Sequence, residues 1–100
     1  MLFVYALFVK KKYMITHVAI WRNDTIYALP KPNRHHNVFL IMDEADHENF
    51  KQEFQGFLDD QGNFLDRREA FIYAKNIGQL RPVIYPNQYS GKQLFSEDLW

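Results

Sequence analysis

Three polar clusters in this chain carry side chains that could bind a ligand or act on one. They are Asn33-Arg34-His35-His36, Asp66-Arg67-Arg68-Glu69-Ala70 and Ser96-Glu97-Asp98-Leu99-Trp100, and apolar anchors lie beside each. Arginine presents a planar fork of N–H donors that suits phosphate, histidine titrates near neutral pH, and carboxylates accept hydrogen bonds from a base or a sugar. These residue types predict a local site for a small anionic, nucleotide-like ligand.

The predicted ligand-binding residues come from all three clusters and are Arg34, His35, His36, Arg67, Glu97 and Asp98. The arginines would contact phosphate, one histidine would donate a hydrogen bond, and one carboxylate would be a polar partner. Neighbouring residues diverge by about 100° on a helix, so the two imidazoles are not expected to face one ligand. The clusters are predicted to meet at one edge of the fold, because all of them lie at the ends of secondary-structure elements.

Each cluster also has a structural interpretation. Asp66 followed by Glu69 forms the spacing of a capping box, which starts a helix. The segment 96–98 could cap a final turn while Leu99 and Trp100 dock on the core.

A small hydrolase is the catalytic alternative. In that hypothesis Glu97 or Asp98 orients His36, which activates water on a phosphodiester or N-glycosidic bond. The sequence holds no nucleophile elbow, no glycine-rich phosphate loop and no metal-ligand spacing. We therefore predict a binding protein rather than an enzyme, with no catalytic residue, metal or cofactor.

Composition limits the class of protein and of partner. The 100 residues are 47% hydrophobic, which predicts one domain spanning 1–100. Twelve basic and twelve acidic residues balance, so no global charge attracts long nucleic acid or an anionic membrane. The absence of cysteine fits a reducing compartment, and cytoplasmic localisation is expected.

The apolar run from Leu2 to Val9 is too short to span a bilayer, and it is expected to form a buried strand. Residues 1–13 are either an extra strand or an N-terminal extension, with Met14 as the alternative start. If the run is exposed, it would favour a homodimer through strand addition.

Two antiparallel hairpins are predicted from runs of β-branched and aromatic residues separated by polar turns. The first pairs Tyr13–Arg22 with Thr25–Leu29 and stops at Pro30, which has no N–H to donate to a sheet. The second pairs Phe57–Leu58 with Asn63–Leu65.

Two helices are predicted to pack on this sheet. The first begins near His35 with Asn33 as its N-cap, and its apolar side would consist of Val38, Ile41, Met42 and Ala45. The second begins after Asp66 and ends at Gly78, a typical left-handed C-terminal stop. The expected fold class is α+β, with a mainly antiparallel sheet built from hairpins and packed against two helices.

The ordered set Arg34-His35-His36, Gly56-Phe57 through Asp66-Arg67-Arg68-Glu69-Ala70, and Ser96-Glu97-Asp98-Leu99-Trp100 resembles a family of small phage and prophage accessory proteins. The likeness covers about residues 14–100. Asn33 stands where members often carry a further histidine, so no metal role is transferred.

The resemblance implies a phage accessory protein that works in the host cytoplasm. Proteins of this kind commonly act against host defence, either by sequestering a nucleotide signal or by covering a host protein. The expected partners are therefore a small anionic ligand or, as the alternative, a host defence protein that the chain inhibits directly.

Overall fold

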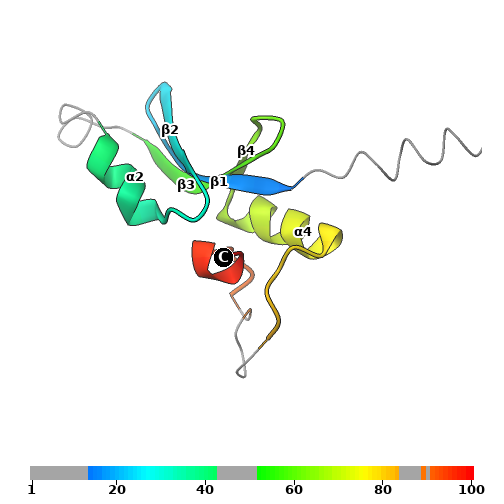
Figure 1. The fold of residues 1–100 in the computed structure, drawn as a ribbon. Helices are drawn as coiled ribbons and strands as arrows, with labels where there is room; N and C mark the ends of the chain where they lie inside the picture. Colours follow the sequence, from blue (N-terminus) through cyan, green and yellow to red (C-terminus); the bar gives the residue numbers. More distant parts are fainter. Residues whose placement is uncertain (1–13, 43–51, 84–88, 90) are drawn as a thin grey trace, which may run out of the picture.

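The structure is a computed structural model that describes residues 14–42, 52–83, 89 and 91–100. In these residues the elements are, in chain order, β1 (Ile15–Arg22), β2 (Thr25–Pro30), α2 (His35–Ile41), β3 (Glu53–Asp59), β4 (Phe64–Asp66), α4 (Arg67–Ile77) and the 3-10 turn η1 (Ser96–Asp98). The predicted α+β fold is confirmed (Figure 1). The predictions for Leu2 to Val9 and for Ala45 lie outside the described residues.

The four strands form one antiparallel sheet in the order β2-β1-β3-β4. Both predicted hairpins are present, and Asn23 and Gly62 in their turns adopt positive φ angles of 53° and 81°. Pro30 is the last residue of the edge strand β2, where a missing N–H costs least. β1 and β3 are not consecutive strands, and α2 belongs to the connection between them.

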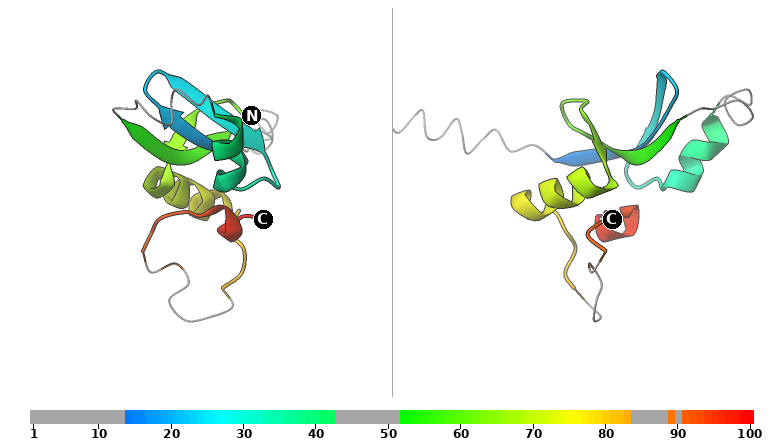
Figure 2. Two further views of the ribbon diagram at one scale, coloured as in Figure 1. Left: turned by 90° about the vertical axis from the view of Figure 1, so that its left-hand side faces the viewer. Right: turned by 180° about the vertical axis from the view of Figure 1, so that it is seen from behind.

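One face of the sheet is covered by α4 and the C-terminal segment, and α2 packs beside the first hairpin (Figures 1 and 2). The buried core takes side chains from all of these parts, among them Val18, Ile20, Val38, Phe57, Phe71, Ala74 and Leu94. Burying one such large apolar side chain contributes about 1.5–3 kcal/mol. The C-terminal segment is therefore part of the core.

Helix α4 begins and ends as its sequence predicts. The Asp66 carboxylate accepts hydrogen bonds from the backbone N–H groups of Arg68 and Glu69, and Glu69 accepts one from Asp66 in return. Gly78 ends the helix with φ of 75°, in the left-handed region that glycine enters without a Cβ clash.

The predicted N-cap of α2 is wrong by one residue. Asn33 closes a turn instead, because its side-chain amide donates to the Pro30 carbonyl at 2.8 Å. Arg34 is the N-cap, and its backbone N–H donates to the Asn37 side chain at 2.9 Å. Ile41, expected on the apolar side of the helix, is 52% exposed, whereas Val38 and Met42 are buried.

Gly56 on β3 is a position where a side chain does not fit. A Cβ there would collide with the Leu65 carbonyl oxygen and lie 2.8 Å from Cζ of Phe64. We expect Gly56→Ala to lower the free energy of unfolding by about 1–3 kcal/mol, the usual cost of overpacking. Urea unfolding measures this change. Gly91→Ala is the matched control, since no described atom lies within 4 Å of its Cβ position, and equal stability of the two variants would contradict the prediction.

Candidate functional site

The first and third polar clusters meet where the C-terminal segment crosses the loop before α2. Nη1 of Arg34 lies 3.2 Å from the Ser96 hydroxyl and 3.8 Å from Oε1 of Glu97. The Ser96 hydroxyl in turn donates to Glu97 at 3.1 Å. The prediction that Arg34 and Glu97 share one face is confirmed. We call the contact of Arg34 with Ser96 and Glu97 the junction.

The last residues hold the C-terminal segment at the junction. The indole N–H of Trp100 donates to the carbonyl of Asn33 at 3.0 Å, directly before Arg34. Leu99 and Trp100 pack against the core, as predicted. The loop that carries Arg34 is therefore fixed by the end of the chain.

Arg67 ties the same segment to α4 and to the sheet. Its guanidinium donates to the Leu94 carbonyl at 2.7 Å and to Oε1 of Gln55 at 2.8 Å, and it lies 4.4 Å from the ring centre of Phe95. Burial lowers the pKa of Arg67, and the charge of Glu97 opposes that shift. Arg67 thus uses its donors on groups within the chain.

His35 and His36 face different surroundings, as the helix geometry predicts. His35 is 8% exposed, and its Nε2 lies 2.7 Å from the Gly56 carbonyl. Since a carbonyl only accepts, Nε2 carries the proton. Burial lowers the pKa of His35 to about 4, so the ring is neutral near pH 7. His36 is exposed.

The two tail carboxylates also differ in their surroundings. Asp98 accepts a hydrogen bond from the Phe95 backbone N–H at 2.9 Å and so caps η1. Burial raises the pKa of Asp98 above its ordinary value. The Glu97 side chain is 67% exposed and faces Arg34. Of the predicted site residues, His36 and Glu97 are exposed, Arg34, Arg67 and Asp98 are partly exposed, and His35 is buried.

In the part of the chain that the structure describes, the junction does not show the pairing of a tail carboxylate with His36 that the hydrolase hypothesis expects. Within the described residues, the carboxylates of Glu97 and Asp98 bond to the junction and to backbone, and neither bonds to His36. The same part of the chain holds no group of three His, Asp or Glu side chains that could bind a metal ion.

A family model described as Phage T4 y16D protein matches residues 14–100. The chain belongs to this family. The match supports the resemblance to small phage proteins, and it includes every residue of the junction. No curated protein and no solved structure gives a significant match. None of the helices in the described ranges has the length and apolar character needed to cross a bilayer.

The sequence analysis placed Ser96 in the third cluster but did not assign it as a partner of Arg34. It missed Gln55 and Phe95, which contact Arg67, because each is a common residue type without a distinctive spacing. Arg34 and Ser96 are 62 positions apart, so no local pattern connects them. The order of the three clusters along the chain was the usable signal.

Protonation of His35 is expected to destabilise the fold. Its folded-state pKa of about 4 lies below the ordinary value of 6.5, so the unfolded chain binds more protons between these values. The stabilisation is complete above pH 6.5 and is lost as pH falls toward 4, by about 3 kcal/mol in all.

Urea unfolding across this pH range measures the effect. His35→Gln is the control variant, because its amide can donate to the Gly56 carbonyl without titrating. The variant should lack this part of the pH dependence. Identical pH profiles for the two proteins would show that His35 does not cause it.

Proposed function

We propose that this phage protein binds a small anionic, nucleotide-like ligand at the junction, and thereby sequesters a defence signal in the host cytoplasm. The observation that carries the proposal is the state of Arg34. Its guanidinium side chain is 31% exposed, and its acidic partner is 3.8 Å away on a mostly exposed residue. A surface ion pair of this kind contributes about 0–1 kcal/mol, so a phosphate could replace Glu97 at little cost.

The surrounding contacts favour a preorganised site. Long-range hydrogen bonds hold both sequence neighbours of Arg34. Trp100 donates to the Asn33 carbonyl, and the His35 ring donates to the Gly56 carbonyl. The backbone of Arg34 is itself bonded to Asn37. A donor held in place before binding loses less entropy when the ligand arrives.

Further groups could recognise the rest of a nucleotide. The Phe95 ring is 46% exposed, with Arg67 near one part of it, and a base could stack on the remainder. Glu97, released from Arg34, could accept hydrogen bonds from a base or a sugar, and His36 could donate one.

Arg34→Gln is expected to weaken nucleotide binding by roughly tenfold or more, because it removes charge-assisted hydrogen bonds to phosphate. Isothermal titration with cyclic and linear nucleotides, including ADP-ribose derivatives, measures the affinity. Lys31→Gln is the control. It also removes an exposed positive charge near Arg34 in the sequence, but the Lys31 side chain is not part of the junction. Absence of heat and of thermal shift with all these compounds would refute the proposal.

A second candidate function, direct inhibition of a host protein, is favoured by the face of the sheet that no described helix covers (Figure 2). Trp21 and Phe54 are 39% and 49% exposed on that face, and Trp21 contacts Phe54 and Phe64 edge to face. The described helices lie on the other side (Figure 2). Exposed aromatic residues of this kind are common anchors in protein interfaces.

This candidate predicts a stable complex with one host protein that native mass spectrometry resolves. Phe54→Glu should abolish the complex, because it places a charge in the apolar face. Leu40→Glu is the control, since Leu40 is 80% exposed on α2, away from that face. Equal complex formation by both variants, or no complex with the wild type, would exclude the face as the inhibitory surface.

A further inference from the structure

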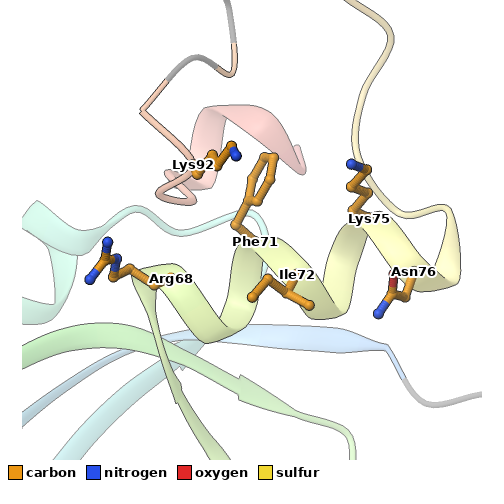
Figure 3. A pocket seen from close by; sticks show the side chains of 6 residues that line it. All are labelled: Arg68, Phe71, Ile72, Lys75, Asn76 and Lys92. Carbon is orange, nitrogen blue, oxygen red and sulfur yellow. The ribbon is translucent and has the colours of Figure 1, made fainter.

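A pocket of about 460 Å³ lies along α4, and its lining residues are Arg68, Phe71, Ile72, Lys75, Asn76 and Lys92 (Figure 3). The helical residues follow a spacing of three and four, so they form one face of α4. Lys92 approaches from the segment that leads to the C-terminus. The volume falls in the range of about 300–1,000 Å³ that small-molecule sites occupy.

The lining is strongly basic although the whole chain has a net charge of zero. Figure 3 shows Arg68 and Lys75 on either side of Phe71 along the helix, with Lys92 opposite. Among the described residues, no acidic side chain lines the pocket. Within the described residues, none of these three cations has an ion pair or a side-chain hydrogen bond. Their N–H donors are therefore available to an anion.

Lys92 is held in place by an unusual backbone. Its φ is 53°, a left-handed value that is uncommon for residues other than glycine. Its N–H donates to the Tyr89 carbonyl at 3.2 Å, and two residues later Leu94 is bonded to the Arg67 carbonyl at 2.8 Å. This turn therefore places Lys92 across from α4. Glycine would adopt the same backbone angle with less strain.

The pocket also has an apolar part. Ile72 is 60% exposed. Phe71 is only 7% exposed and packs on Tyr89. A ligand with an apolar or aromatic portion could cover Ile72 and remove its surface from water. The amide of Asn76 lies at the same wall and could bond to a polar group of the ligand.

We infer that this pocket binds a small molecule that combines a phosphoryl group with an apolar or aromatic body. The phosphoryl oxygens would lie among Arg68, Lys75 and Lys92, and the body would lie against Ile72. Three cations match the double negative charge of a phosphate better than they match the single negative charge of a carboxylate. The planar guanidinium of Arg68 also suits the arrangement of phosphate oxygens. The pocket shares no lining residue with the junction, so it goes beyond the function proposed above and does not depend on it.

Titration of the full chain with phenyl phosphate, followed by amide shifts in ¹H–¹⁵N spectra, tests the inference. The shifts should concentrate at 68–76 and 91–94. Lys92→Gly should weaken binding by roughly tenfold or more, because it removes a charge-assisted contact. Its melting temperature should be unchanged or higher, because glycine relieves the positive φ. Higher salt should weaken wild-type binding.

Two variants separate the pocket from other causes. Lys31→Gln should leave the affinity reported by the shifts at 68–76 and 91–94 within about twofold of the wild type, because Lys31 does not line the pocket. Ile72→Ala should lose the preference for phenyl phosphate over inorganic phosphate. Binding of phenyl phosphate at the pocket without any nucleotide binding would support this inference and refute the proposed function.

Two results would overturn the inference. One is the absence of shifts at 68–76 and 91–94 with millimolar phenyl phosphate. The other is equal affinity of the wild type and Lys92→Gly. Loss of binding in Arg34→Gln, with Lys92→Gly unaffected, would assign the phosphate to the junction instead.

Discussion

The half-buried guanidinium of Arg67 makes the contacts on which the position of the C-terminal segment depends. A positive charge removed from water is costly unless its donors are bonded and its charge is partly balanced. Here the Leu94 carbonyl and the Gln55 amide accept its hydrogen bonds, and the Phe95 ring packs against it. The charge of Glu97 favours the ionised form. Moving the C-terminal segment away from α4 would therefore break the hydrogen bond of Arg67 to Leu94 and its contact with the Phe95 ring.

Two further long-range hydrogen bonds extend this arrangement to the loop before α2. Trp100 bonds to Asn33, and the neutral ring of His35 bonds to Gly56 on β3. Gly56 combines two constraints, because it leaves room for Phe64 and Leu65 on one side and presents its carbonyl to His35 on the other. Arg34 lies between these two anchors, so its position at the junction is a consequence of the packing around it.

The C-terminal segment creates two separate polar surfaces as it crosses the molecule. Near its end it places Ser96 and Glu97 against Arg34, and earlier it places Lys92 across from α4. The family match to residues 14–100 includes both surfaces. The junction pairs Arg34 with the exposed acid Glu97, whereas the charged residues that line the pocket in the described ranges are all basic and lie beside the apolar Ile72. The two proposed anion sites therefore differ in their chemistry.

The local features of the fold could be predicted because the interactions that set them span only a few residues. The Asp66–Glu69 capping box, the stop at Gly78 and the two hairpins depend on hydrogen bonds and backbone angles within each short segment. The prediction that Asn33 is the N-cap of α2 was wrong, although it also concerned a local hydrogen bond. The Asn33 side-chain amide donates to the Pro30 carbonyl instead. A sequence pattern does not rank two such local bonds.

The sequence by itself determined the α+β class, the hairpin pairs, the limits of α4 and the three clusters that carry the chemistry. The tertiary structure alone decided which of those groups remain available to a ligand. His35 and His36 are the same residue type, yet His35 is buried against the Gly56 carbonyl and His36 is exposed. Arg67 donates to the Leu94 carbonyl and to Gln55, whereas Arg34 contacts the Ser96 hydroxyl and the exposed Glu97. The pocket with Lys92 likewise exists only because the chain folds back onto α4. The physical reason is that burial and hydrogen-bond partners come from residues distant in the chain, as with Arg34 and Ser96 at a separation of 62 positions.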